Sequence, residues 1–429
     1  MRLKIKRKGL YKHVFRAKRL LKFTLCRSDP VIFCGGMDGA PGKILLLATV
    51  LAITALVFGN GAATPALADI AKAFPDKSHE TIQLIVTIPP LLIMVSTLIC
   101  GQLSRMVRKK TLVLIGMVLL AIGGIAPAFF GGLTFILIMR GVFGAGTGFL
   151  IPISQGLIAD YFQGHDRDTF MGYRGSTAAI FGMFYTMAGG HLCAIYWRYT
   201  FLAYLIVVPV FLFILFKMPE PESHKAETKG GKTAGLTRTT WFYVVIYFLY
   251  NVTMMCFITN EAFVMSAANV GNAKIIGYII TISNIGGIAV GLLLGWLTKT
   301  LKNFTIVFAL FLLALGFVLS NFVDTAVTFT IAAMIWGMGF GTFNPTVALK
   351  IIGSVPKAAA TMALALLTCA MGVGQFISPI VYSHVNRILG LEGPRASWVI
   401  AAVCFSAAFV AALVKVSLWP KKNEVEAAT

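Results

Sequence analysis

The sequence is poor in charge and poorest in acid. Only 12% of its 429 residues are charged, and 16 acidic residues stand against 37 basic ones. Soluble proteins carry about 25% charged residues, whereas 58% of this chain is hydrophobic. A water-soluble chain could not cover so much apolar surface with so few charges. In a bilayer the same surface faces hydrocarbon, so the composition indicates an integral membrane protein.

Signatures of enzymes and metal sites are also missing. The seven cysteines form no close Cys-x-x-Cys pair, which argues against a disulfide framework and a zinc site. Residues 226–233 fit a loose phosphate-loop pattern, but they lie in a Lys-rich linker without the strand and helix that such a loop needs. The charged cluster 165–168 has no paired nucleophile and is expected to be a solvated turn. We therefore expect no cofactor, no metal and no enzymatic activity.

The chain does contain twelve apolar runs of bilayer length. A helix of about 20 residues crosses ~30 Å of hydrocarbon, and lipid offers no partner for exposed backbone groups, so each run is expected to be helical. The runs lie near 44–68, 81–103, 111–130, 133–158, 170–195, 199–217, 241–268, 275–298, 303–321, 326–349, 358–385 and 396–419. The predicted fold class is all-α integral membrane, with twelve transmembrane helices in two six-helix pseudo-repeats.

The basic residues are distributed unevenly between the gaps. If the spans alternate in direction, 30 of the 37 Lys and Arg lie on the side of the two termini, six lie on the other side, and Arg140 lies inside a run. By the positive-inside rule, both termini are cytoplasmic and the protein is a multi-pass protein of the cell (inner or plasma) membrane. A nucleic-acid binder would instead collect its basic residues on one folded face, so no nucleic-acid partner is expected.

The longest polar gap divides the spans into two sets of six. The predicted organisation is a basic cytoplasmic tail (1–42), a first six-helix half (43–217), a central cytoplasmic loop (218–239), a second six-helix half (240–419) and a cytoplasmic C-terminal tail (420–429). A Gly-x-Leu pair and a basic cluster follow the second run of each half, at Gly101 and Gly295, which is a weak sign of internal duplication. Two interpretations of the N-terminal tail stay open. It lies on anionic lipid, or it is not translated because translation begins at Met37.

Charged side chains inside a bilayer are costly and mark functional candidates. Of 53 charged residues, only Arg140 and Glu261 fall well inside runs. Arg140 is placed roughly 10 Å below the outer surface. It either faces a water-filled cavity, where it binds an anion or gates protons, or it is structural and bonded to backbone carbonyls. Glu261 is placed about 30 Å from the inner end. It either titrates or pairs with a cation during transport, or it is an interfacial carboxylate already in water.

Uncharged polar residues also occupy the middle or outer-middle levels of the runs. Such groups either hydrogen-bond between helices or contact a ligand. As a set they predict a mostly apolar cavity with few fixed charges. The candidates are Asn60, Tyr185, Asn251, Asn284, Trp336 and Gln375.

At this point the residues resemble the major facilitator superfamily. The stretch 59–68 is similar to the Gly-x5-Pro pattern of its twelve-span drug/proton antiporters, with Ala68 at the final proline. The motif around Arg140 resembles the family's fourth-helix arginine motif, which the resemblance links to proton coupling. The stretch from 189 to 201 resembles the one joining spans five and six. The residues taken as conformational motifs on this basis are Gly101, Arg105, Arg108, Lys109, Gly144, Gly146, Gly189 and Gly190.

Two departures from the family pattern stand out. In the loop after Gly101, Arg105 replaces the usual Asp and Arg108 replaces a Gly, which alters the charge latch that the family uses between its halves. The fifth-helix antiporter motif lacks its Gly-Pro near Tyr185.

The resemblance implies a secondary transporter that works by alternating access. We expect a monomer in the lipid bilayer, driven by protons, that exports a small, partly apolar compound. One alternative is an importer of a nutrient such as an organic anion or sugar. A membrane-embedded enzyme or sensor is a second alternative, for which the sequence offers neither a catalytic constellation nor an added domain.

Overall fold

The computed structural model describes residues 40–104, 106–162, 164–218, 238–355 and 360–418. Every element in these ranges is helical. The predictions for the N-terminal tail, Met37, Arg105, most of the central loop and the C-terminal tail fall outside the described residues.

Twelve helical segments of the described ranges are long and apolar enough to cross a membrane, as predicted. The first span comprises α2 (Ala40–Val57), η1 (Gly59–Ala66) and α3 (Leu67–Ala73). It is followed by α4 (His79–Leu103), α5 (Lys109–Ile125) with η2 (Ala126–Ala128), α6 (Leu133–Tyr161), α7 (Gly164–Ile195), and η3 (Trp197–Ile206) with α8 (Val207–Lys217). The remaining spans are α9 (Arg238–Ala267), α10 (Ala273–Leu301), then η4 (Lys302–Phe304) and α11 (Thr305–Phe322), α12 (Ala326–Gly353), α13 (Ala360–Leu389) and α14 (Ala396–Leu418).

Polar caps fix the starts of three spans. Ser78 accepts a hydrogen bond from the backbone N–H of Thr81 at the start of α4, and Asn272 caps α10 in the same way. Thr325 and Thr328 form a reciprocal capping box at the start of α12. Each cap satisfies N–H groups that the first helical turn leaves unpaired, so these polar residues end the loops and set the helix boundaries.

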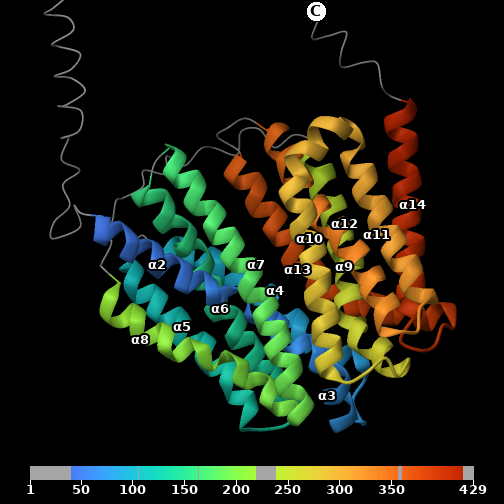
Figure 1. The fold of residues 1–429 in the computed structure, drawn as a ribbon, viewed down its shortest axis with the longest axis horizontal. Helices are drawn as coiled ribbons and strands as arrows, with labels where there is room; N and C mark the ends of the chain where they lie inside the picture. The colour runs from blue at the N-terminus through green and yellow to red at the C-terminus, as the bar shows by residue number, and fades with distance from the viewer. Residues whose placement is uncertain (1–39, 105, 163, 219–237, 356–359, 419–429) are drawn as a thin grey trace, which may run out of the picture. The chain divides into compact units, whose positions relative to one another are not determined.

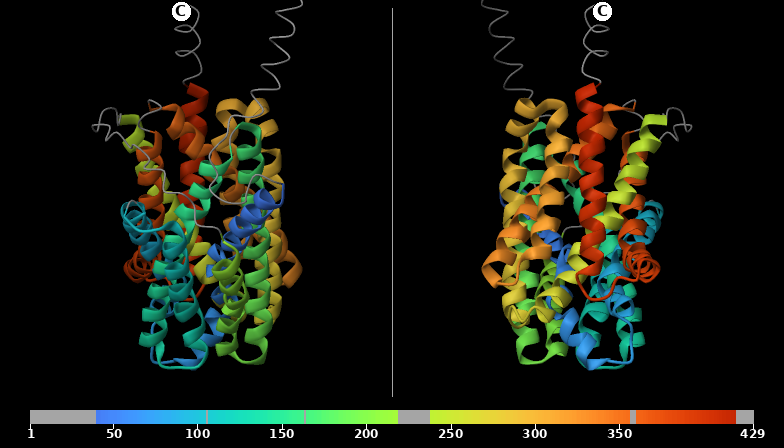
Figure 2. Two further views of the ribbon diagram at one scale, coloured as in Figure 1. Left: turned by 90° about the vertical axis from the view of Figure 1, so that its left-hand side faces the viewer. Right: turned by 90° about the vertical axis from the view of Figure 1, so that its right-hand side faces the viewer.

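Helix packing repeats after a shift of six spans. In the first half α4 packs on α6, α5 on α6 and η1 on α7; in the second, α10 packs on α12, α11 on α12 and α9 on α13. In both halves, glycines allow the helices of these pairs to approach one another closely. A Cβ atom added to Gly148 would lie 2.7 Å from the backbone oxygen of Ile93, and one added to Gly337 would lie 2.1 Å from that of Ser283. This packing agrees with two six-helix pseudo-repeats, whose long helices run side by side in Figure 2.

An arginine also occupies equivalent places in the two halves. Arg198, at the start of the sixth span, donates to the carbonyl oxygen of Gly131 between the third and fourth spans at 3.0 Å. Arg395, just before the twelfth span, donates to the carbonyl oxygens of Asn321 and Val323 at 3.2 and 2.7 Å. Arg395 also pairs with Asp324 at 2.5 Å. We call these two arrangements the arginine clasps.

The two halves meet through α7 on α10 and through α4 on α13 (Figure 1). Gln83 of α4 donates to the Oδ1 atom of Asn260 in α9 at 3.0 Å. The Tyr278 hydroxyl of α10 bonds the Nε2 atom of His191 in α7 at 2.9 Å. A Cβ atom on Gly190 would lie 2.6 Å from a backbone oxygen of α10. We call the helix ends that carry these five residues the closed end.

Glycines at the opposite ends of the same helices have free space around them. A Cβ atom added to Gly101 of α4, Gly175 of α7, or Gly291 and Gly295 of α10 would meet no atom within 4 Å. Among the described residues, the close contacts between the halves therefore lie at the closed end and at mid-helix, where a Cβ atom on Gly372 of α13 would come within 3.0 Å of the backbone oxygen of Pro90 in α4.

One pair of glycines within α7 makes this packing testable. A Cβ atom on Gly189 would lie 2.0 Å from the backbone oxygen of Ala62, so Gly189→Ala forces the first span away from α7. We expect a loss of about 1–3 kcal/mol in the free energy of unfolding, which is typical of overpacking. Gly175→Ala is the matched control, because its methyl group meets nothing within 4 Å. Thermal unfolding of both proteins in detergent checks this, and equal unfolding temperatures would contradict the close packing.

Candidate functional site

A buried arginine ties together four spans of the first half. Arg140 of α6 is 0% exposed, and its guanidinium donates three hydrogen bonds. The acceptors are the Ile85 carbonyl at 2.9 Å, the Tyr204 hydroxyl at 3.0 Å and the Oδ1 atom of Asn60 at 2.5 Å. The ring of Phe143 lies 4.4 Å from the guanidinium carbon. These contacts join the first, second and sixth spans to the fourth, and we call this group the arginine brace.

The brace lies where two spans depart from regular α-helix. The first span is a 3₁₀ helix over Gly59–Ala66, and the sixth is one over Trp197–Ile206. The Tyr204 hydroxyl donates to the carbonyl oxygen of Gly59 at 2.9 Å, and the side-chain amide of Asn60 donates to that of Val86 at 3.1 Å. A 3₁₀ stretch inside a longer helix often marks a hinge or local strain. The brace therefore stabilises two non-standard segments at once.

The structure agrees with the structural interpretation of Arg140 more closely than with the cavity interpretation. Its side chain is fully buried and bonded to a backbone carbonyl, so it does not face a water-filled cavity in this conformation. Among the described residues it forms no ion pair.

Glu261 of α9 is buried and directly follows Asn260, which contacts Gln83 of the first half. Its side chain is 2% exposed, and its Oε1 atom has no hydrogen-bond partner. The alternative of an interfacial carboxylate already in water is therefore wrong for this conformation. Its neighbour Asn260 accepts from Gln83 and donates to the Cys256 carbonyl at 2.9 Å. Gln83 was missed by sequence reasoning, although a glutamine inside an apolar run is a signal of the kind used for the other candidates.

An uncharged network joins three helices of the second half. Gln375 of α13 donates to the Oδ1 atom of Asn251 at 3.2 Å, and Asn251 donates to the Tyr247 carbonyl at 2.8 Å. The Tyr247 hydroxyl donates to the Oδ1 atom of Asn344 at 2.7 Å, and the amide of Asn344 donates to the Tyr250 hydroxyl at 3.0 Å. Two of the five, Asn251 and Gln375, were predicted. The other three were missed, although Asn344 is a polar residue in the middle of an apolar run.

The other predicted polar candidates do not join one site. Tyr185 is fully buried beside Tyr204, with ring centroids 5.8 Å apart, and its hydroxyl has no partner. Trp336 stacks on Phe257 at 4.4 Å, and its indole N–H is also unpartnered. Asn284 is exposed on α10. The structure thus joins Asn60 to Arg140 and Asn251 to Gln375, in opposite halves.

The predicted motif residues occupy two kinds of place. Gly144, Gly146, Gly189 and Gly190 lie in tight contacts, because an added Cβ atom would come within 2.6 Å or less of a backbone oxygen. Gly101 has open space. Arg108 precedes α5, which begins at Lys109.

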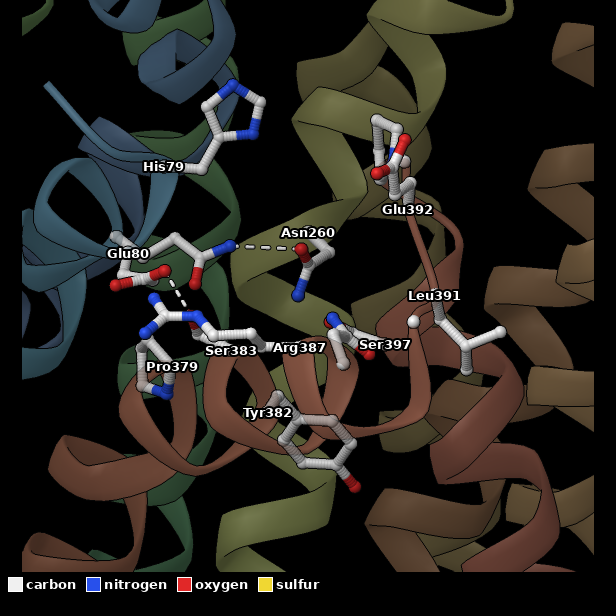
Figure 3. A pocket seen from close by; sticks show the side chains of 15 residues that line it. His79, Glu80, Asn260, Pro379, Tyr382, Ser383, Arg387, Leu391, Glu392 and Ser397 are labelled. Atoms are coloured by element: carbon white, nitrogen blue, oxygen red, sulfur yellow. Dashed lines mark hydrogen bonds between the residues drawn. The ribbon is translucent and has the colours of Figure 1, made fainter. Parts of the chain in front are cut away.

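A pocket of about 380 Å³ lies at the closed end (Figure 3). Its walls come from α4, α9, α13, the loop before α14, and α14 itself. Three charged side chains, Glu80, Arg387 and Glu392, line it, and the Ser383 hydroxyl donates to the Glu80 carboxylate. This pocket differs from the predicted apolar cavity, and sequence reasoning did not find it.

Comparison with known proteins defines the class. Residues 49–379 match the sequence profile of the major facilitator superfamily, and the chain belongs to that family. It is therefore a multi-pass membrane transporter and not an enzyme. The drug/proton antiporter group within the family stays a prediction.

Solved structures share the fold at low sequence identity. The nucleoside transporter NupG is 14% identical, with a TM-score of 0.71 over 86% of this chain and 99% of its own. A peptide transporter, POT, in complex with sulfate is 15% identical, with a TM-score of 0.69 over 90% and 96%. A bacterial homologue of the human lysosomal transporter Spinster, in an inward-facing and occupied conformation, is 15% identical, with a TM-score of 0.68 over 90% and 99%.

One curated relative is similar in part of its sequence. A triacylglyceride transporter of Mycolicibacterium smegmatis (strain ATCC 700084 / mc(2)155) is 25% identical over 138 residues, which is 30% of this chain. The matched part of this chain spans 25% of the length of that relative.

Proposed function

We propose that the protein exports a small, partly apolar compound in exchange for protons, by alternating access. The observation that carries this proposal is the position of Glu261, a buried carboxyl with an unpartnered oxygen, next to the Asn260–Gln83 contact between the halves. The presence of 30 of the 37 basic residues on the side of the termini supports the assignment of the closed end to the outer side of the membrane. In this assignment the conformation is open toward the cytoplasm.

A proton can be coupled to the motion at this place. A carboxyl group carries one proton or none, and Glu261 is shielded from water while Gln83 contacts Asn260. Separation of the halves at the closed end would bring the outer solution to the carboxyl. Glu261 then exchanges its proton with one solution or the other according to which end of the protein is open. Coupling of proton movement to transport requires this dependence. The arginine brace serves a positioning role, since each of the three guanidinium nitrogens of Arg140 already donates a hydrogen bond within the first half.

The uncharged network of the second half suits a cargo without fixed charge. The side-chain amides of Asn344 and Gln375, both half-buried, offer hydrogen bonds, and the neighbouring rings of Tyr247 and Tyr250 offer apolar surface. Pockets for small molecules commonly combine apolar walls with a few placed polar groups. The curated relative is named for an apolar cargo, which is of the same polarity class.

Transport in proteoliposomes tests the proposal, with Nile red, an uncharged apolar dye, as the probe. A pH gradient of one unit supplies about 1.4 kcal/mol per proton, enough for about tenfold accumulation. We expect the wild type to accumulate a dye and Glu261→Gln only to equilibrate it, while exchange of labelled for unlabelled dye continues. Asp76→Asn is the matched control, because Asp76 is an exposed acid at the same side.

Two outcomes would contradict the proposal. Accumulation by Glu261→Gln at the wild-type level would remove the role of this carboxyl. A growth and uptake screen of a null mutant across drugs and metabolites identifies the cargo, and loss of uptake of a nutrient would favour import.

A further inference from the structure

We propose that the pocket at the closed end binds a small zwitterion, an α-amino acid with a short apolar side chain. The pocket is separate from the arginine brace and from the uncharged network, and the proposal does not depend on the cargo. Its volume of about 380 Å³ is in the range of sites for small ligands. Its walls carry charges of both signs, which suits a molecule that carries both signs as well.

The first argument is a surplus of hydrogen-bond acceptors. The side-chain amide of Asn386 donates to the Ser397 hydroxyl at 2.8 Å, but its Oδ1 atom is buried and has no donor. The carboxylates of Glu80 and Glu392 add further acceptors to the same walls. Buried polar atoms are rarely left unpaired, so the ligand is expected to bring N–H donors. An ammonium group brings three and carries the charge that two carboxylates favour.

The second argument is an arginine on the wall beside Glu80. Figure 3 shows the Arg387 guanidinium and the Glu80 carboxylate on the same side of the pocket, with Glu392 on the opposite side. Among the described residues, none of these three forms an ion pair. A guanidinium binds a carboxylate through two parallel hydrogen bonds. Arg387 therefore recognises the carboxylate of the ligand, while Glu80 and Asn386 take its ammonium group.

The other residues that line the pocket favour a ligand with an apolar side chain and argue against a metal ion. Pro379, Leu391 and Pro394 give the pocket an apolar part. In the described part of the chain no three His, Cys, Asp or Glu side chains are grouped as metal ligands would be.

Binding at this place has a conformational consequence. Glu80 belongs to α4 of the first half, whereas Arg387 and Asn386 belong to α13 of the second. A ligand held by both halves binds the conformation in which they touch and loses contacts when they separate. It therefore stabilises the closed end and is expected to inhibit transport.

Equilibrium dialysis of the full chain in detergent tests the site, with radiolabelled L-leucine as the probe. The competitors are 3-methylbutylamine, which lacks the carboxylate, and 4-methylpentanoate, which lacks the ammonium group. We expect saturable binding of leucine, with each analogue at least about tenfold weaker, since each loses one charge-assisted contact. No saturable binding of leucine, or an analogue that competes as well as leucine, would overturn the proposal.

Substitutions then assign the two contacts. Glu80→Gln still accepts from Ser383 and should keep the fold, but it should weaken leucine binding about tenfold and leave 4-methylpentanoate unaffected. Arg387→Gln should weaken leucine about tenfold and leave 3-methylbutylamine unaffected. Asp76→Asn is the control and should bind as the wild type does. Unchanged leucine binding by Glu80→Gln, with the protein still monodisperse, would refute the assignment.

Discussion

Replacement of Arg140 by alanine is expected to abolish transport in every mode and to destabilise the first half. The substitution removes the hydrogen-bond donor of three acceptors: the Ile85 carbonyl, the Tyr204 hydroxyl and the Oδ1 atom of Asn60. The side chain of Arg140 is 0% exposed, so water cannot replace the lost hydrogen bonds. A buried polar group left without its partner costs about 1–3 kcal/mol. Gradient-driven accumulation, dye exchange and the unfolding temperature in detergent should all fall together.

Two further variants show whether the brace is structural. Arg140→Lys keeps the charge, but a lysine ammonium lacks the planar guanidinium that reaches all three acceptors. Its unfolding temperature should therefore lie between those of the wild type and Arg140→Ala. Arg167→Ala, an exposed arginine of α7, should leave both transport and stability unchanged. If Arg140→Ala kept the wild-type unfolding temperature and lost only accumulation, Arg140 would act in coupling and not as a brace. This contrasts with Glu261→Gln, which should lose accumulation and keep exchange.

Covalent linkage of the closed end is expected to stop transport. Gln83 and Asn260 share a hydrogen bond of 3.0 Å across the halves, so cysteines at these two positions are within reach of a short bifunctional methanethiosulfonate reagent. The link removes the state that is open at this end, and we expect a decrease of about 100-fold in transport. Flux measured before treatment, after treatment and after addition of a reductant checks this, since the reductant should restore it.

The controls follow from the free cysteines of the chain. Cys256 is buried one helical turn from Asn260, so reagent-treated wild type and both single variants are needed. At the opposite end, Gly101→Cys should react with a soluble thiol reagent, because open space surrounds that position. Wild-type flux through the cross-linked protein would mean that these contacts need not break during transport.

The sequence predicted the fold because bilayer-length apolar runs leave few alternatives. It also identified Arg140, since a charge inside such a run is rare. It did not predict how Arg140 is used, because the Ile85 carbonyl has no signature in the sequence and the Tyr204 hydroxyl lies in a 3₁₀ segment. Hydrogen-bond partners of this kind depend on the relative register of four spans.

The pocket at the closed end was missed for a different reason. Glu80 and Glu392 lie near helix ends, where charged residues are ordinary, and more than 300 positions separate them. Only the approach of α4 to α13 brings them to one cavity. Glu261, in contrast, was found by its depth, and the structure then resolved whether it was shielded from water.

The arginine clasps have a practical consequence for labelling this protein. Arg198 and Arg395 each fasten the loop between two spans to the start of a third, through carbonyl oxygens that any insertion would displace. Epitope tags or fluorophore sites placed at 129–132 or 323–325 would therefore disturb three spans together. The turn at 268–271, which neither arginine touches and which leaves the Asn272 cap of α10 in place, is the better position for such a reporter.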